Sequence, residues 1–169
     1  MNLISQMFYS HLRIGKNGKP FRMYKFRTMV MNADTQKKGL RALNEADGPV
    51  FKIRNDPRYT RIGRFLAHTG LDELPQLYNI LCSDMALFGP RPLPIEEAAK
   101  LKPWQQKRHA IKPGIMSPWI LEGYHTMKFD DWMKSDIAYI KQKSFWYDCK
   151  LAVRASVFLL RLMAKEIGI

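Results

Sequence analysis

Apolar side chains recur at helical spacing in several parts of the chain. The clearest run is Leu71–Leu81, where four leucines and a tyrosine return every three or four positions and predict one helix. The segments 129–141 and 146–167 show the same pattern and predict two more amphipathic helices. Residues 59–67 predict a short basic helix, and residues 95–110 predict a further helix.

Near the N-terminus the pattern changes to the alternation of a strand. Over 21–26 the side chains of Phe21, Met23 and Lys25 alternate with those of Arg22, Tyr24 and Phe26, and Asn17-Gly18 just before them favours a tight reversal. Residues 7–31 therefore predict a β-hairpin. The next two segments predict a short exposed helix and a loop: 33–47 and 48–59. Together these elements predict an α+β fold, a mostly helical single domain over 1–169 with a small N-terminal β-hairpin.

Composition narrows the class of protein. An apolar content of 46% is enough for a buried core in 169 residues. The two cysteines, Cys82 and Cys149, lie far apart, which excludes a disulfide scaffold and a structural zinc site and fits a reducing compartment. The most apolar part of the tail, 151–163, is too short to span a bilayer and contains Arg154 and Arg161.

The charge points to an anionic partner. Lys plus Arg number 28 against 15 Asp plus Glu, a net charge of +13. Such an excess favours nucleic acid, an acidic membrane face or phosphorylated substrates. A nucleic-acid-binding protein is the weakest of these, because the sequence has no recognition-helix, zinc-finger or RNA-binding aromatic signature.

An acidic pair lies in the predicted helix 71–81. If Asp72 is the N-cap, Pro75 falls at the third helical position, where it breaks no intrahelical hydrogen bond. Asp72 would then only cap the helix. Alternatively, Asp72 and Glu73 together hold a divalent cation and meet a phosphate there. An aspartate carboxylate can also act as a nucleophile toward phosphorus.

Several basic residues are candidates for binding that phosphate. Lys25 and Arg27 share one face of the second predicted strand, where they either bind a ligand or are simply solvated. Arg91 lies between Pro90 and Pro92, which stiffen its backbone and suit it to bidentate phosphate binding or to an exposed turn.

Other basic residues carry weaker signals. Four more arginines could line a phosphate pocket, face anionic lipid or be exposed to solvent: Arg54, Arg58, Arg61 and Arg64. The histidines show no metal-ligand spacing and are interpreted as structural or surface residues: His11, His68, His109 and His125.

Five motifs in order resemble the bacterial sugar transferase family, the monotopic polyprenyl-phosphate phosphoglycosyl transferases. The resemblance covers nearly the whole chain. The motifs are Arg13-Ile14-Gly15 with Gly18, Tyr24-Lys25-Phe26-Arg27-Thr28-Met29, Leu71-Asp72-Glu73-Leu74-Pro75-Gln76-Leu77, Asp84-Met85 with Gly89-Pro90-Arg91-Pro92, and Lys112-Pro113-Gly114-Ile115.

The resemblance implies a reaction. Family members transfer a sugar-1-phosphate from a nucleotide-diphosphate sugar to a polyprenyl phosphate such as undecaprenyl phosphate, with release of nucleoside monophosphate. This step initiates exopolysaccharide, capsule or O-antigen synthesis. It requires Mg²⁺ and is thought to pass through a covalent phosphosugar intermediate on the aspartate. By this resemblance Asp72 is the nucleophile, and Glu73 joins it in holding the metal or handles a proton. Arg91, Lys25 and Arg27 bind substrate phosphate.

The resemblance also implies a location, the cytoplasmic face of the bacterial inner membrane, where a basic protein meets an anionic leaflet. Amphipathic helices, in particular 146–167, would lie at the membrane surface or pack on the core. Only seven residues precede Phe8, so we expect the upstream re-entrant membrane helix of the family to be absent from this chain.

Two further positions depart from the family pattern. Ala67, beside His68, stands where the family usually has a basic residue, and Met116-Ser117-Pro118-Trp119 replaces the usual continuation after Pro-Gly-Ile. The alternative hypothesis is therefore a catalytically impaired member that binds nucleotide sugar or a partner transferase.

Overall fold

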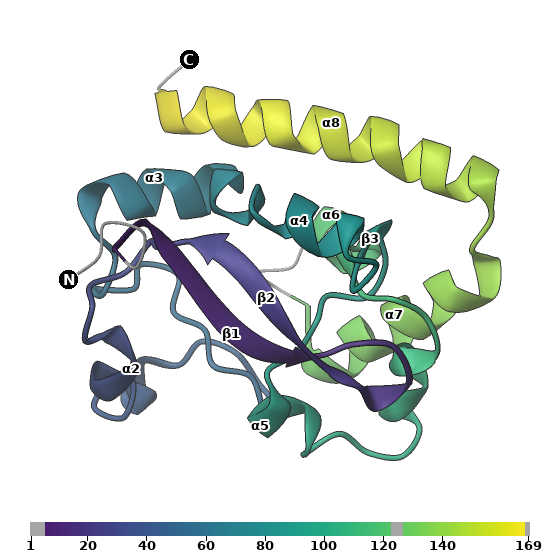
Figure 1. Cartoon of the computed structure of the whole chain (residues 1–169), viewed down its shortest axis with the longest axis horizontal. Helices are drawn as coiled ribbons and strands as arrows, with labels where there is room; N and C mark the ends of the chain where they lie inside the picture. The colour runs from purple at the N-terminus through teal and green to yellow at the C-terminus, as the bar shows by residue number, and fades with distance from the viewer. Residues whose placement is uncertain (1–5, 123–126, 168–169) are drawn as a thin grey trace.

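The computed structural model describes residues 6–122 and 127–167 and confirms the predicted α+β class. Helices provide most of the regular structure, and the strands form two small two-stranded sheets (Figure 1). The predicted hairpin is present as β1 (Phe8–Ile14) and β2 (Pro20–Phe26), antiparallel with Tyr9 opposite Lys25. Asn17 and Gly18 form its tip with positive φ angles of 56° and 75°, as an Asn-Gly reversal requires.

The segment after the hairpin is mostly loop. It contains the short helix α2 (Ala33–Gln36) and a 3₁₀ turn at Arg41–Leu43. Helix α3 (Arg61–Thr69) then begins at an N-cap, Thr60, whose side chain accepts a hydrogen bond from the Gly63 N–H at 2.9 Å. A Cβ atom on Gly63 would collide with the Thr28 carbonyl, so only glycine allows α3 to lie this close to the end of the hairpin.

The prediction of one helix over 71–81 was wrong. Gly70 takes a left-handed conformation, with φ at 76°, and ends α3. A 3₁₀ turn, Leu71–Glu73, follows, and helix α4 begins only at Gln76 and ends at Leu81. Pro75 occupies the cap position of α4, because it has no N–H to donate back into the preceding turn. Asp72 therefore does not cap a helix, and its carboxylate is available for other contacts.

The second half of the chain contains the parallel strands β3 (Ala86–Phe88) and β4 (Gly114–Met116), which sequence reasoning missed. The single helix predicted over 95–110 is also wrong. Pro103 interrupts it, and the structure instead has α5 (Ile95–Ala98) and a 3₁₀ segment, Gln105–Ala110.

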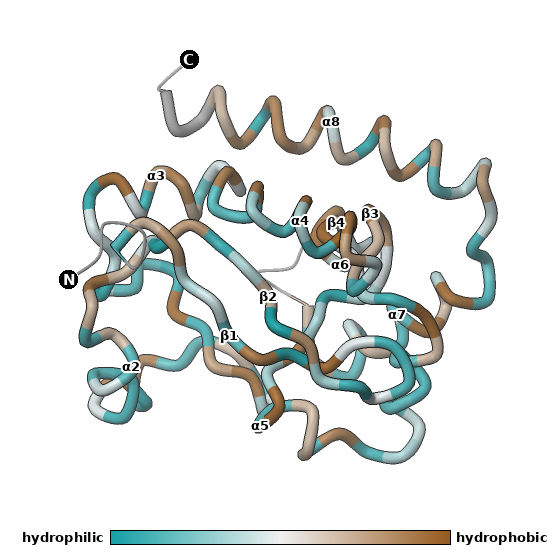
Figure 2. The backbone as a smooth tube through the Cα atoms, in the orientation of Figure 1, coloured by the Kyte–Doolittle hydropathy of each residue, from teal (hydrophilic) through white to brown (hydrophobic). Residues whose placement is uncertain are grey.

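Three helices complete the chain: α6 (Pro118–Leu121), α7 (Phe129–Gln142) and α8 (Phe145–Ile167). The last two confirm the predicted amphipathic helices. Helix α8 contacts α3 and α6, and apolar and polar positions mix along its length (Figures 1 and 2). Within α8, Leu151 and Ala155 are buried, whereas Trp146, Val153 and Leu160 are exposed. Within 6–122 and 127–167, no helix combines the length and apolar character that a membrane crossing needs.

Two hydrophobic clusters hold these elements together. The larger one joins the end of the 89–93 loop to the second half of the chain and consists of Leu93, Ala98, Leu101, Trp119, Phe129, Trp132 and Met133. The smaller one lies under β2 and consists of Phe21, Met23 and Met85. Trp119 of the divergent segment 116–119 thus serves the core, stacked on Trp132 with ring centroids 4.0 Å apart.

Candidate active site

Four charged side chains from distant parts of the sequence meet at one point. The Lys25 ammonium lies 3.1 Å from Oδ2 of Asp72 and 2.7 Å from Oε1 of Glu73. The same Glu73 oxygen accepts a hydrogen bond from Nη2 of Arg91 at 2.7 Å. Two carboxylates and two cations thus form a single connected cluster, which we call the charged cluster. The structure brings together Lys25, Asp72, Glu73 and Arg91, all of which the sequence singled out.

Lys25 reaches this cluster because of the period of β2. Phe21, Met23 and Lys25 share one face of the strand, and the two apolar residues are buried against Met85. The next position on that face carries the ammonium over the 3₁₀ turn 71–73. Because side chains alternate along the strand, the face that packs in the core also presents Lys25 to the site at the end of the strand.

Asn79 of α4 holds β2 in this place. Its Oδ1 accepts a hydrogen bond from the Tyr24 N–H at 3.1 Å, and its Nδ2 donates to the Arg22 carbonyl at 2.8 Å. The side chain is fully buried and takes the place of a neighbouring strand along the free edge of β2. Sequence reasoning missed Asn79, because a lone asparagine in an apolar helix carries no signal of its partner.

The acidic pair is presented by the 3₁₀ turn between α3 and α4. In this turn the Glu73 N–H donates to the Gly70 carbonyl at 3.1 Å, and both acidic side chains reach the Lys25 ammonium. Asp72 is 7% exposed, and the Glu73 side chain is 13% exposed. Both carboxylates are therefore sheltered from bulk water, which strengthens their interactions with the two cations.

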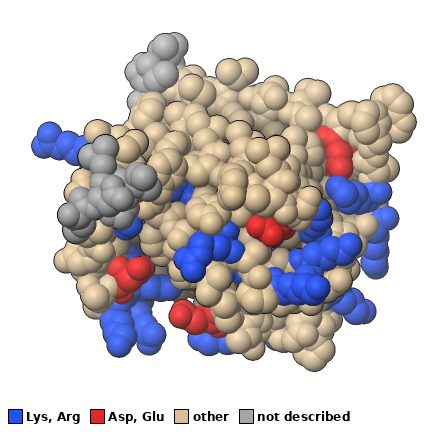
Figure 3. Space-filling view, viewed as in Figure 1, with Lys and Arg blue, Asp and Glu red and all other residues tan. Residues whose placement is uncertain are grey.

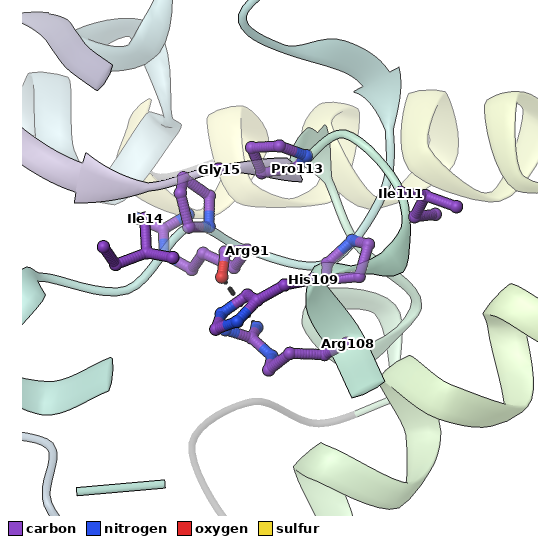
Figure 4. A pocket seen from close by; sticks show the side chains of 9 residues that line it. Ile14, Gly15, Arg91, Arg108, His109, Ile111 and Pro113 are labelled. Carbon is purple, nitrogen blue, oxygen red and sulfur yellow. Dashed lines mark hydrogen bonds between the residues drawn. The ribbon is translucent and has the colours of Figure 1, made fainter. Parts of the chain in front are cut away.

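Arg91 belongs to a loop that is fastened on both sides. The Gly89 N–H donates to the Met116 carbonyl at 3.0 Å, and a Cβ on Gly114 would collide with the backbone of Gly89. Beyond Arg91, Nη1 of Arg13 donates to the Pro92 carbonyl at 3.3 Å. Figure 4 shows Arg91 beside Ile14, Gly15 and Arg108, in a pocket where the hairpin meets the 3₁₀ segment. The loop is therefore held on both sides of Arg91 before any ligand binds.

The electrostatics of Glu73 follow from this geometry. Burial alone would raise the pKa of its carboxyl. The charges of Arg91 and Lys25, together with the hydrogen bonds both donate, outweigh burial and lower the pKa from 4.5 to about 2. Glu73 is consequently an anion at neutral pH, and it aligns both cations.

A metal site at Asp72 and Glu73 stays a prediction, and it would need ligands beyond these two residues. Within the described part of the chain, no group of three or more His, Cys, Asp and Glu side chains is arranged to hold a metal alone. The ion pairs engage one oxygen of Asp72 and one of Glu73. Mg²⁺ is commonly bound by one or two carboxylates plus substrate phosphates, and the second oxygens of this pair suit that mode.

The remaining basic candidates lie elsewhere. Nη2 of Arg27 donates to the Phe8 carbonyl at 3.3 Å, and its guanidinium lies 5.4 Å from the Tyr9 ring centroid, so its role toward phosphate stays a prediction. Arg58 is buried in a two-point pair with Asp56, at 2.9 and 2.6 Å, and does not belong to an exposed basic run.

The other members of that run are exposed: Arg54, Arg61 and Arg64. His68, beside Ala67, makes an edge contact with Tyr59 at a centroid distance of 6.1 Å. Burial and the charge of Arg108 lower the pKa of His109 to about 4, which agrees with its structural interpretation. His125 lies outside the described residues.

Comparison with known proteins adds independent information. A family model for bacterial sugar transferases matches residues 2–161. Galactosyl transferase CpsE of Streptococcus agalactiae is 43% identical over 144 residues, which cover 85% of this chain and 32% of that protein. Undecaprenyl-phosphate galactose phosphotransferase of Salmonella typhimurium is 39% identical over 160 residues, 90% of this chain and 33% of that protein.

A further relative is UDP-glucose:undecaprenyl-phosphate glucose-1-phosphate transferase of Escherichia coli. It is 34% identical over 154 residues, which cover 86% of this chain and 31% of that protein. The chain thus spans about a third of the length of these curated relatives. Because the family match extends over most of the chain, and includes the charged cluster, the chain belongs to the bacterial sugar transferase family.

Proposed function

We propose that this chain transfers a sugar-1-phosphate from a nucleotide-diphosphate sugar to a polyprenyl phosphate such as undecaprenyl phosphate. The observation that carries the proposal is the charged cluster, in which Lys25 and Arg91 flank the carboxylates of Asp72 and Glu73. Two relatives, 39% and 34% identical over the aligned residues, have undecaprenyl phosphate in their names, and the second name also specifies UDP-glucose. The product would initiate the synthesis of a capsule or other exopolysaccharide.

In the first step an Asp72 carboxylate oxygen attacks the β-phosphorus of the donor. A phosphoanhydride bond to the bridging oxygen breaks, and the nucleoside monophosphate leaves with that oxygen. Negative charge spreads over the phosphoryl oxygens as this happens, and fixed cations stabilise it best in a sheltered site. Lys25 and Arg91 are such cations, since Glu73 already aligns both.

In the second step an oxygen of the polyprenyl phosphate attacks the phosphorus of the aspartyl phosphosugar. The bond to Asp72 breaks, the carboxylate is restored and a polyprenyl diphosphate sugar is formed. The low pKa of Glu73, about 2, makes it a weak base, so it serves this step by aligning Lys25 and Arg91 and not by accepting a proton. Mg²⁺, held by Asp72 and Glu73 together with donor phosphates, would supply further neutralisation of phosphoryl charge.

The surface supports a location at the anionic cytoplasmic leaflet. Apolar side chains are exposed on α3, α4 and α8, among them Ile62, Leu81 and Leu160. These helices lie along one edge of the molecule, and on the face shown in Figure 3 that edge is mostly uncharged, with Lys and Arg gathered mainly below it. An apolar edge bordered by cations is suited to a membrane surface.

The test is release of nucleoside monophosphate from UDP-galactose or UDP-glucose in the presence of undecaprenyl phosphate and Mg²⁺. We expect Asp72→Asn to abolish release and to prevent trapping of the labelled sugar phosphate on the protein. Asp131→Asn, at an exposed pair with Lys134, is the matched control and should retain release. Normal turnover by Asp72→Asn would remove that residue from the mechanism. Binding of UDP-sugar without any turnover by the wild type would support the impaired member instead.

A further inference from the structure

The carbonyl group of Arg91 is held by an arginine that sequence reasoning did not single out. Nη2 of Arg108 donates to the Arg91 carbonyl oxygen at 2.7 Å, the bond drawn in Figure 4. Arg108 is 1% exposed and comes from the 3₁₀ segment 105–110. The buried guanidinium of Arg108 thus supports the loop that carries the half-buried guanidinium of Arg91.

Arg108 is in turn oriented by α7. Its Nε and Nη2 both donate to Oδ2 of Asp136, at 3.0 and 2.6 Å, and Asp136 is fully buried. The Arg108 guanidinium also lies 5.5 Å from the Trp132 ring centroid, one helical turn before Asp136. These contacts leave Arg108 little freedom to turn away from the Arg91 carbonyl.

The Arg91 loop needs such a support for a geometric reason. The prolines on either side restrict φ at their own positions and keep Arg91 out of the helical region, but they leave its ψ angle variable within the extended region. Rotation about ψ swings the Arg91–Pro92 peptide plane and with it the path of the side chain relative to Glu73. A hydrogen bond to the Arg91 carbonyl fixes that plane.

We propose that Arg108, oriented by Asp136, is a positioning residue that fixes the Arg91 loop so that the Arg91 guanidinium meets the donor diphosphate. The inference rests on the proposed function. It assigns Arg108 and Asp136 no contact with substrate. It also makes α7, from the core of the second half, a determinant of phosphate binding at the charged cluster.

The buried position of the pair favours this role over a purely stabilising one. Buried ion pairs are often no more stabilising than apolar residues of similar size, because desolvation offsets their attraction. Here burial raises the pKa of the Asp136 carboxyl to about 6 against the opposing charge of Arg108, which reflects that cost. What the pair provides is an oriented Arg108 guanidinium, which donates a hydrogen bond to the Arg91 carbonyl.

The test compares two double variants that each remove a buried pair. Arg108→Met with Asp136→Asn removes the support, and Arg58→Met with Asp56→Asn removes a matched buried pair away from the Arg91 loop. We expect the first to lower kcat/KM for the nucleotide-diphosphate sugar by about 30- to 100-fold, the scale of a small misplacement of a binding group. The KM for polyprenyl phosphate should stay within about 3-fold, and the control should lose less than about 3-fold in either parameter.

A second comparison shows whether the effect passes through Arg91. Arg91→Ala should cost about 100-fold in the wild type but less than about 5-fold when added to the Arg108 and Asp136 changes, because groups that act as a unit are not additive. The inference is overturned if Arg91→Ala costs as much in the Arg108 and Asp136 double variant as it does in the wild type. It is also overturned if that double variant loses no more kcat/KM than the control. If the double variant does not fold, Arg108→Lys serves instead. It keeps a charge for Asp136, but a single ammonium cannot reproduce both contacts, so the same loss and the same non-additivity are expected.

Measuring UDP binding by calorimetry distinguishes a failure of this inference from a failure of the proposed function. A wild-type chain that binds UDP without turnover would contradict the proposed function. The inference would then stand only if the Arg108 and Asp136 changes weaken UDP binding non-additively with Arg91→Ala. Additive weakening, or no binding of UDP by the wild type, overturns the inference as well.

Discussion

The Oδ1 atom of Asn79 accepts a hydrogen bond from the backbone N–H of Tyr24 at 3.1 Å, and this contact places the lysine-bearing strand against the acidic turn. Tyr24 precedes Lys25 directly. The distance between Lys25 and the two carboxylates is therefore set by one buried amide in α4.

The first prediction concerns this amide. Asn79→Ala should destabilise the fold by about 2–4 kcal/mol, because it removes a fully buried side chain and leaves the part-buried Tyr24 N–H and Arg22 carbonyl without this partner. Urea unfolding measures the effect. Asn55→Ala, at an exposed asparagine, is the control and should change stability by less than about 0.5 kcal/mol. A loss below about 1 kcal/mol for Asn79→Ala would show that Asn79 does not hold β2.

The second prediction concerns the pH dependence of stability. The folded-state pKa of Glu73 is lowered from 4.5 to about 2, so the stability it contributes is complete above pH 4.5 and lost as the pH falls toward 2. Lys25→Met raises that pKa and should destabilise the protein by about 2 kcal/mol near pH 7. The difference from the wild type should shrink below pH 4.5. Unfolding free energies measured from pH 2 to 7 check this, with exposed Lys19→Met as control; a difference that is constant with pH would be inconsistent with the pairing.

The third prediction separates Arg58 from its basic neighbours. Arg58→Met leaves the Asp56 carboxylate buried without its ion pair and should cost about 3–5 kcal/mol. Arg64→Met, at an exposed position of α3, should change stability by less than about 0.5 kcal/mol. Thermal unfolding compares the stabilities of the two variants. Equal losses of stability would show that the buried ion pair of Arg58 and Asp56 does not stabilise the fold more than an exposed arginine does.

The fourth prediction concerns the contact of α3 with the end of the hairpin. Alanine normally favours a helix over glycine by about 1 kcal/mol. At position 63 the added Cβ would collide with the Thr28 carbonyl, so Gly63→Ala should instead destabilise by about 1–3 kcal/mol. In Gly39→Ala the Cβ would meet the Gln36 carbonyl oxygen at an ordinary 3.7 Å, and this control should be nearly neutral. Stabilisation by Gly63→Ala in urea unfolding would argue against the close approach.

The local pattern of the sequence was sufficient for several elements. The Asn17-Gly18 reversal and the alternation along β2 predict the hairpin, and helical periodicity predicts α7 and α8. These signals depend only on neighbouring residues, because a turn needs particular φ angles and an amphipathic helix needs a period of 3.6. The same local reading failed at Pro75 and Pro103, where the missing N–H divides the expected helices.

The chemical identity of the site was also readable in the sequence, but its assembly was not. The sequence singles out four ionisable residues by their motifs: Asp72, Glu73, Lys25 and Arg91. No local pattern, however, predicts that residue 25 meets residue 73 or that residue 91 meets residue 108. Those contacts depend on Asn79 and Asp136, whose partners lie tens of positions away in the chain. The sequence determined the turns, the helical faces and the candidate chemistry, because each depends on adjacent residues. Only the tertiary structure decided which cation meets which carboxylate, because directed hydrogen bonds between buried groups exist only once the whole chain has packed.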